Sequence, residues 1–480
     1  MPSRTDPQSQ PASPQADEAP TPPVPRIGIV GGGPSGLFTA YELQRLADGP
    51  IAMTLFEASG RLGGKILSPR FTNSPHRYEA GAAEFYDYEH FGHDPLKALI
   101  RELGLPIRPL AGSTVVMGQG RIANRDDLRA RLGAEAESAL LAFDAIARDR
   151  MSPRGFYHSG DAPDPDLAGP PHPRFATLLA SIPSRSARDY LERMIHSDLA
   201  AEPTQTSVEY GLQNYLMNDP AYLRLYRIEG GNERLVDALA ERIDAKVLLG
   251  HRVTGVGRSA DGSLQVTAEG DDGLLEREFD HLVVALPHAA ILGIEYRDLR
   301  LDAAIRRHHV HHDHPGHYLR ITARFESPRP ATGDEDGFWM LDAFGGCCLY
   351  DELAGAPEAL EGAIFGWLLG GDAARHAAGQ DDAGLIESAL ASLPAWLRPA
   401  GAPAETRVHR WIGSVSAMPG GEHWWSLEAR HRPDPVAHAS LLIVGDYLFD
   451  STLNGALDSA EYAAASIAAD LARAREENRR

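Results

Sequence analysis

Five residues near the start of the chain have the types and spacing of a phosphate-binding turn. They are Gly31, Gly33, Pro34, Ser35 and Gly36. The first glycine allows a tight turn, the second lets the backbone approach a pyrophosphate, and the third lets a helix pack on a strand. A helix N-terminus at this place also attracts negative charge. The spacing therefore predicts that the chain binds a dinucleotide.

The elements that must position this turn are a strand before it and a helix after it. Residues 27–30 form a short β-rich run, and residues 37–43 continue the turn as an apolar helical stretch. Residues 53–56 are predicted to form the second parallel strand, which ends at Glu57, about 20 positions after the third glycine. A carboxylate at this point accepts hydrogen bonds from ribose hydroxyls.

A second glycine-rich turn follows directly. It contains Ala58, Arg61, Gly63 and Gly64. A pyridine-nucleotide dehydrogenase has no need of this turn. It resembles the extension with which the flavin-containing amine oxidase superfamily brings more backbone and an arginine to the FAD pyrophosphate. The resemblance covers most of residues 26–470 and implies an FAD-dependent oxidoreductase.

The resemblance also implies which other residues contact FAD. Residues 78–85 match the segment that runs under the isoalloxazine, and Val253 lends its backbone to the adenine. Asp446 contacts the ribityl or phosphate region. A helix N-terminus at Thr452 and Leu453 faces the flavin N1/O2 edge, where its dipole stabilises the anionic reduced flavin. The implied set is completed by Gly81, Ala82, Ala83, Glu84, Trp411, Gly445 and Ala456.

Two charged residues depart from the family's pattern near the expected substrate site. Arg320 aligns with the lysine that, in many amine oxidases, holds a water beside flavin N5, and a permanently charged arginine cannot donate a proton there. The alternative is an exposed strand arginine paired with an acid. Glu84 stands about where L-amino-acid oxidases carry an arginine for the substrate carboxylate. A carboxylate attracts an ammonium group instead, unless it binds a buried arginine or caps a helix.

Aromatic residues offer further candidates for the site. Trp411 resembles a tryptophan that packs near the flavin in this family, with a large core aromatic as the alternative. The two-tyrosine cage of monoamine oxidases is absent, because Thr452 and a residue near Gly413 align with its positions. Tyr447 and the run 423–425 are candidates to line the cavity instead.

Two features suggest a metal site or a covalent link to the flavin, and we expect neither. The run 308–317 contains His308, His309, His311, His312, Asp313, His314 and His317. We predict an exposed loop that titrates near neutral pH rather than a metal site. Cys347 and Cys348 precede Trp411, whereas the flavin-linked cysteine of monoamine oxidases follows the tryptophan. We therefore expect no metal and a noncovalent FAD.

The composition excludes several classes of partner. The net charge is −21, from 46 basic against 67 acidic residues, and both nucleic acid and an anionic membrane require a basic face. No apolar run is long enough to cross a membrane. The two adjacent cysteines indicate no disulfide framework, which fits a reducing cytoplasm. Residues 1–25, rich in Pro, Ser and Gln, predict a disordered tail. A homodimer is possible.

The length predicts about two domains. We expect an α/β fold in which a doubly wound, Rossmann-like FAD-binding domain is joined to a second, α+β substrate domain. The FAD-binding domain would comprise residues 26–95, 225–297 and 407–480, and the substrate domain residues 96–224 and 298–406. Helices are predicted over 128–147 and 175–194, and strands over 318–325 and 338–341. No second GxGxxG motif indicates a separate NAD(P)H domain.

The leading functional prediction is oxidation of a C–N bond in an amine, with a polyamine or other cationic amine favoured, to an imine. Electrons would pass to O2 or to another acceptor. In this family the step is usually described as transfer of a hydride equivalent to flavin N5, for which the protein positions the C–H bond. The alternatives are an L-amino-acid oxidase, a C–C desaturase or protoporphyrinogen-oxidase-like enzyme, and a non-catalytic flavin-binding sensor.

Overall fold

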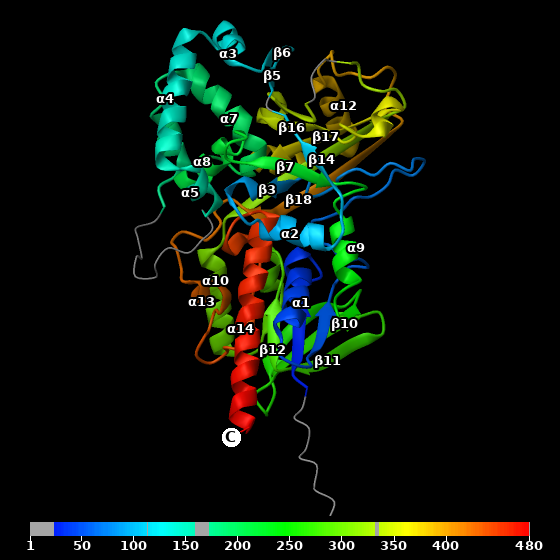
Figure 1. The fold of residues 1–480 in the computed structure, drawn as a ribbon, viewed down its shortest axis with the longest axis vertical. Coiled ribbons are helices and arrows are strands. Elements are labelled where there is room, and N and C mark those ends of the chain that lie inside the picture. The colour runs from blue at the N-terminus through cyan, green and yellow to red at the C-terminus, as the bar shows by residue number, and fades with distance from the viewer. Residues whose placement is uncertain (1–23, 113, 159–171, 332–335, 480) are drawn as a thin grey trace, which may run out of the picture.

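The structure, a computed structural model, describes residues 24–112, 114–158, 172–331 and 336–479. The predicted disordered tail, residues 1–25, lies almost wholly outside the described residues. Figure 1 shows two lobes, with the glycine turn's helix α1 (Pro34–Leu46) in the lower lobe and most of the shorter helices in the upper one. No helix in the described part of the chain has the length and apolarity needed to cross a membrane.

The lower lobe is built on a five-stranded parallel sheet. Its strands, in spatial order, are β19 (Leu441–Ile443), β12 (His281–Val284), β1 (Arg26–Val30), β2 (Ala52–Phe56) and β8 (Ala245–Leu248). The central strands of a parallel sheet are buried on both faces, so they are largely apolar. Ile27, Ile29 and Val283 have no exposed surface. The predicted strands at 27–30 and 53–56 both lie in this sheet.

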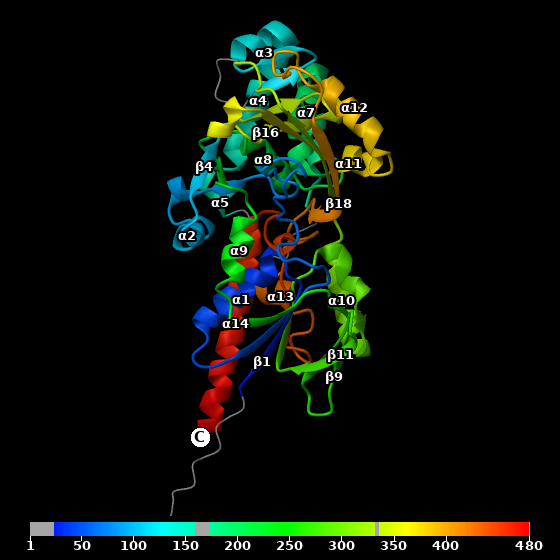
Figure 2. The same cartoon turned by 90° about the vertical axis from the view of Figure 1, so that its right-hand side faces the viewer.

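Different layers cover the two faces of this sheet. Helix α1 and the C-terminal α14 (Leu453–Arg479) pack on one face. The other face carries the sheet β11 (Gly273–Phe279), β10 (Leu264–Gly270), β9 (Arg252–Arg258) and β13 (Glu295–Tyr296), together with α10 (Leu299–His311). Figure 2 shows the two layers on opposite sides of β1. The predicted α/β fold is therefore confirmed, with a mainly antiparallel sheet in place of helices over much of one face.

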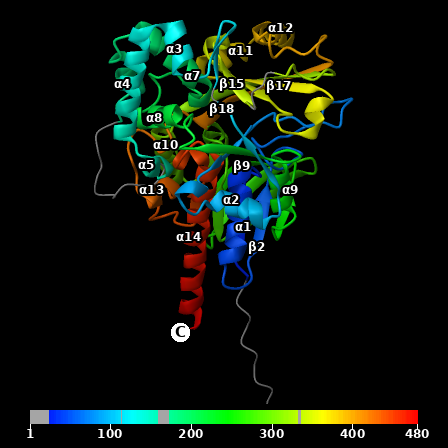
Figure 3. The ribbon, with the colours of Figure 1, turned by 45° about the horizontal axis from the view of Figure 1, so that its top comes forward.

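The upper lobe is built on a seven-stranded sheet. In spatial order it contains β18 (Glu405–Ser416), β14 (Pro315–Phe325), β17 (Ala363–Gly370), β16 (Cys347–Asp351), β15 (Phe338–Leu341), β5 (Val115–Met117) and β6 (Gly120–Ile122). Helices α3 (Arg125–Leu132), α4 (Ala134–Arg150), α7 (Arg185–Leu199) and α8 (Val208–Leu216) lie beside it (Figure 3). The predicted strands at 318–325 and 338–341 are β14 and β15.

Smaller elements join the lobes and cover their edges. A three-stranded sheet contains β3 (Phe85–Asp87), β7 (Arg224–Ile228) and β4 (Ile107–Leu110). The remaining α-helices are α2 (Pro95–Glu102), α5 (Pro153–Tyr157), α6 (Phe175–Ala180), α9 (Arg234–Ala240), α11 (Gly371–Ala377), α12 (Asp382–Ser392) and α13 (Leu427–His431). Short 3-10 turns are η1 (Glu89–Phe91), η2 (His288–Gly293), η3 (Ala343–Gly345), η4 (Pro357–Leu360) and η5 (Asp446–Leu448).

Both long predicted helices are interrupted in the structure. Gly133, with φ of 90°, separates α3 from α4 within the predicted helix 128–147. The predicted helix 175–194 is divided into α6 and α7, and Ser184 caps the second by accepting a hydrogen bond from the Ala187 amide. Pro183 precedes this cap and cannot continue a helix. The predicted domain boundary at 406/407 falls within β18, which pairs with β14 of the upper sheet.

Candidate active site

A cavity of about 710 Å³ is lined by residues of both lobes. This volume lies in the range of cofactor and ligand sites. The predicted cofactor contacts that line it are Gly31, Gly33, Pro34, Ser35, Glu57, Ala58, Gly64, Gly81, Ala82, Ala83, Glu84, Val253, Trp411, Gly445, Asp446, Thr452, Leu453 and Ala456. Segments up to 425 positions apart in the sequence therefore meet at one cavity, from Gly31 to Ala456.

The glycines of the first turn differ in how closely other atoms pack around them. Gly31 has φ of 111°, and a Cβ there would lie 2.3 Å from the Ala285 carbonyl oxygen. A Cβ on Gly36 would lie 2.0 Å from the Gly31 oxygen, so this glycine serves helix packing and does not line the cavity. A Cβ on Gly33 would meet only the Gly64 Cα, at 3.9 Å. The space beside Gly33 is thus open to a phosphate group.

Glu57 is held at the cavity by two backbone amides. Its Oε2 accepts from Gly32 N at 2.9 Å, and its Oε1 accepts from Ser59 N at 2.8 Å. A carboxylate has about four lone-pair sites, so acceptor capacity remains for ribose hydroxyls. These observations fit the adenosine end of FAD.

In the second glycine turn, the cation that lines the cavity is Lys65 rather than the predicted Arg61. Arg61 donates to the carbonyl oxygens of Leu62 and Gly64, at 2.9 and 2.5 Å, and does not line the cavity. Gly63, with φ of 102°, shapes the same turn outside the cavity lining. Lys65, three residues beyond Leu62, lines the cavity instead. Arg61 therefore organises the turn, and Lys65 supplies its positive charge.

Lys65 links the N-terminal turn to the C-terminal segment. Its Nζ donates to Asp446 Oδ2 at 2.7 Å and to the Ser414 carbonyl oxygen at 2.7 Å. Thr452 Oγ1 accepts from Gly455 N at 3.0 Å and so caps α14 where it meets the cavity. This arrangement places an ion pair and a positive helix end along one wall of the cavity.

Trp411 and Gly81 form a tightly packed floor for the central part of the cavity. The Trp411 indole Nε1 donates to the Ala80 carbonyl oxygen at 2.6 Å. A Cβ on Gly81 would lie 1.9 Å from the Lys65 carbonyl oxygen and 3.5 Å from the Trp411 ring. Trp411 therefore has a fixed orientation at the cavity surface, as expected of a ring that packs near the isoalloxazine.

Glu84 stands at the end of the cavity that faces the upper sheet. It lines the cavity together with Tyr86, Tyr318 and Leu368. The Tyr350 hydroxyl donates to its carboxylate, while its Oε2 is buried with no hydrogen-bond partner. Burial raises the pKa of Glu84, and nearby guanidinium groups oppose this rise. A carboxyl group with one unpartnered oxygen therefore lies in the wall of the cavity.

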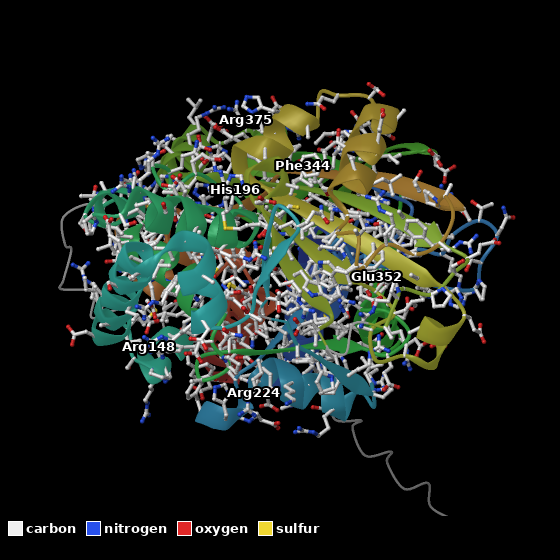
Figure 4. The ribbon with its side chains drawn as sticks, turned by 90° about the horizontal axis from the view of Figure 1, so that it is seen from above. Arg148, His196, Arg224, Phe344, Glu352 and Arg375 are labelled. Carbon is white, nitrogen blue, oxygen red and sulfur yellow. The ribbon has the colours of Figure 1, made fainter. Side chains whose placement is uncertain are left out.

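Arg320 lies outside this cavity, which corrects its predicted place beside the flavin. It is fully buried, pairs with Glu352, and its guanidinium lies 4.8 Å from the Tyr350 ring centroid. Glu352, labelled in Figure 4, follows directly after β16. The side chain that β14 presents to the cavity is that of Tyr318, two residues earlier on the same face. Arg320 is therefore a structural arginine. It is paired with an acid, as the alternative prediction has it, but it is buried rather than exposed.

Tyr447 and the aromatic run 423–425 also lie outside the cavity lining. Tyr447 is buried, and its ring makes edge contacts with His288 and His312 at centroid distances of 5.5 and 5.6 Å. Trp425 stacks on His311 at 3.7 Å. These aromatic rings belong to a layer behind the cavity.

The histidine run is not the exposed, neutral-pH loop that we predict from the sequence. His308 and His311 belong to α10, and His308 and His312 are each 1% exposed. Burial lowers the pKa of His308 and of His311 to about 4. The apolar positions of α10 repeat at helical spacing and direct these rings inward. The run of histidines conceals this periodicity in the sequence.

One trio of side chains has metal-ligand types. Potential ligand atoms of His288, His309 and Asp313 lie within 4.8 Å of one another, the one such group among the described residues. The His288 and His309 rings are stacked, with centroids 3.9 Å apart, and His288 Nε2 contacts the His309 carbonyl oxygen at 2.8 Å. Stacked rings do not direct their in-plane lone pairs at one ion. The absence of a functional metal remains a prediction.

Comparison with known proteins agrees with this geometry. A family model described as flavin-containing amine oxidoreductase matches residues 34–468. The flavin-dependent L-tryptophan oxidase RebO of Lentzea aerocolonigenes is 27% identical over 301 residues, which span 58% of this chain and 61% of that relative. Cyclohexylamine oxidase from Brevibacterium oxydans IH-35A has a TM-score of 0.71 at 22% identity, over 94% of this chain and 100% of that chain.

A second solved structure, putrescine oxidase bound to putrescine, has a TM-score of 0.66 at 19% identity, over 93% of this chain and 99% of that chain. The glycine turns, Glu57 and the capped α14 fit FAD, and neither Cys347 nor Cys348 is among the described residues that line the cavity. The chain belongs to the flavin-containing amine oxidoreductase family and is an FAD-dependent oxidoreductase.

Proposed function

We propose that this protein oxidises a C–N bond of a cationic amine to an imine, which water then hydrolyses to a carbonyl compound. The reaction removes two electrons and two protons from the CH–NH unit. FAD, when bound, accepts the two electrons and passes them to O2 or to another acceptor. The single observation that supports the substrate class is Glu84, which lines the cavity and whose buried Oε2 has no hydrogen-bond partner among the described residues.

The residues of this chain would bind FAD and the amine at separate parts of the cavity. Gly33, Glu57 and Lys65 suit the pyrophosphate and ribose, and Thr452 places the positive end of α14 near the cofactor. Tyr86, Tyr318 and Leu368 form an apolar and phenolic wall that excludes water around the reacting carbon. This wall orients the substrate, and the Glu84 carboxylate attracts its charged group.

Oxidation of an L-amino acid is the second candidate, since one relative is named as an L-tryptophan oxidase. Such a substrate requires a cation for its carboxylate. Arg410 lines the cavity, but its guanidinium already donates to Asp382 at 2.7 Å and to the Gln380 carbonyl oxygen at 2.9 Å. The site geometry therefore favours an amine. A cytoplasmic location and a homodimer belong to the same proposal.

Anaerobic titration of the purified flavoprotein tests the substrate class. Polyamines, aromatic amines and amino acids are added separately while the oxidised-flavin absorption band is followed. We expect bleaching by cationic amines, and at least about tenfold weaker amine binding in Glu84→Gln, which removes one charge-assisted contact. Bleaching by amino acids alone would contradict the assigned role of Glu84. Bound flavin that no member of the panel bleaches would favour the desaturase or sensor alternatives.

A further inference from the structure

The edge strand of the upper sheet, β18, has a bulge where it passes the cavity. It pairs with β14 on both sides of residues 412–414, so these residues lie opposite the single residue His317 of β14. Ile412, Gly413 and Ser414 all line the cavity. Bulges occur often beside active sites, because they bend a strand locally and redirect its groups. The shape of this bulge therefore sets part of the cavity wall.

The side chain of His317 holds the centre of the bulge. Gly413 has a φ of 65°, which favours glycine, and it is absent from the described residue pairs of β14 and β18. Its amide donates a hydrogen bond to His317 Nδ1 at 3.0 Å. A backbone N–H that leaves a ladder costs free energy unless another acceptor pairs with it. The imidazole supplies this acceptor.

The bulge is linked directly to residues at the expected FAD site. The Ser414 carbonyl oxygen accepts from Lys65 Nζ at 2.7 Å, and the same Nζ donates to Asp446 Oδ2 at 2.7 Å. The Ser414 hydroxyl donates to the carbonyl oxygen of Trp411 at 2.8 Å. Lys65, Asp446 and Trp411 all line the cavity. A change in the bulge would therefore reach the charged wall and the aromatic floor together.

The surroundings of His317 keep its ring neutral near neutral pH. The side chain is half-buried, and the His317 amide donates to the Ala200 carbonyl oxygen, just after α7, at 2.8 Å. The charged groups that act on the ring are Arg375 and Asp372 of α11, which pair with each other at 2.9 Å; Arg375 is labelled in Figure 4. Burial and Arg375 lower the pKa of His317, and Asp372 opposes them. The Nδ1 lone pair is thus available to the bulge.

We propose that His317 is a positioning residue of the FAD site: its neutral imidazole holds the bulge in the shape that binds the cofactor, and its protonation releases the bulge. This inference goes beyond the proposed amine oxidation and requires only that FAD binds. A protonated ring carries a hydrogen on Nδ1 and cannot accept from the Gly413 amide. Without that bond the binding-competent bulge is less populated, which raises the apparent Kd for FAD. FAD affinity should therefore fall at acid pH.

Two substitutions of His317 separate its acceptor from its bulk. In His317→Asn, the side-chain oxygen can take the place of Nδ1 and accept from Gly413, but it does not titrate. His317→Leu keeps a side chain of similar size without an acceptor. The Kd for FAD is measured by quenching of flavin fluorescence during titration of deflavinated protein. At about pH 8, we expect His317→Asn to bind FAD within about threefold of the wild type and His317→Leu to bind it about five- to tenfold more weakly.

The pH dependence of the same Kd completes the test, and it does not depend on the folding of His317→Leu. From about pH 8 to about pH 5, the wild-type Kd should rise several-fold more than that of His317→Asn. His376→Asn, at an exposed position of α11, is the matched control and should keep the wild-type profile. Equal pH profiles for the wild type and His317→Asn overturn the inference, as does equal FAD binding by His317→Leu and wild type. No amine is present, so a failure of the proposed function leaves this result decisive.

Discussion

Replacing Gly33 by alanine separates the folding of the glycine turn from its cofactor binding. Gly33 is the N-cap of α1 with φ of −76° and ψ of −179°, a backbone that any residue adopts, and a Cβ there would meet only the Gly64 Cα at 3.9 Å. We therefore expect the free energy of unfolding of the apoprotein to change by less than about 1 kcal/mol. Gly36→Ala should lower it by about 1–3 kcal/mol or more, because its Cβ would lie 2.0 Å from a backbone oxygen.

The effect of Gly33→Ala should appear in FAD affinity. The added methyl group would occupy the space through which the backbone approaches the pyrophosphate, and a steric cost of about 1.4–3 kcal/mol raises the Kd for FAD roughly 10- to 150-fold. Quenching of flavin fluorescence during titration of deflavinated protein gives this Kd, and circular dichroism gives the stability. Gly60→Ala is the control, since nothing lies within 4 Å of its Cβ. Unchanged FAD affinity in Gly33→Ala would refute the position assigned to the pyrophosphate.

Three further predictions concern the elements around the site. Thr452→Val removes the acceptor for Gly455 N and should cost about 1 kcal/mol of stability in urea unfolding, whereas Thr452→Ser should restore most of it. Because burial lowers the pKa of His308 to about 4, the unfolded chain takes up the proton first as the pH falls. Stability should then decrease between about pH 6.5 and 4, by up to about 3 kcal/mol from this residue, and His308→Gln should reduce the decrease. Arg320→Met leaves Glu352 with one fewer partner, and chemical denaturation should show a loss of about 3 kcal/mol in the free energy of unfolding. A loss of FAD-binding free energy larger than this loss of stability would place Arg320 at the cofactor instead.

The parts of the site that the sequence predicts well are those defined by local geometry. A turn that needs positive φ at Gly31 and close packing at Gly36 can be recognised from a few adjacent residues. The same holds for Glu57, whose distance from the turn is set by one helix and one strand. The C-terminal strand–turn–helix around Asp446 and Thr452 is also local. The resemblance to a family then supplies which segments meet, a step that spacing alone does not provide.

The charges of the second glycine turn show where local reasoning stops. Arg61 and Lys65 are both cations close to the same glycines, and their residue types do not distinguish them. The structure directs Arg61 back onto the carbonyl oxygens of Leu62 and Gly64, and directs Lys65 toward Asp446. The decisive partner of Lys65 lies 381 positions away along the chain. A side chain's role is thus set by a contact that the local pattern does not contain.

Whether a residue lines the substrate end of the cavity depends on its position along the strand as well as on the face that it occupies. Tyr318 and Arg320 share a face of β14, but two residues span about 6.6 Å, and this distance separates a cavity-lining phenol from a fully buried arginine. The Tyr318 hydroxyl is held from α7, because it donates a hydrogen bond to the Asp198 carbonyl oxygen at 3.0 Å. An alignment therefore identifies the strand that faces the expected flavin site. The residue that lines the substrate end of the cavity is determined by how far this strand extends past the cavity and by which helix packs against the strand's end.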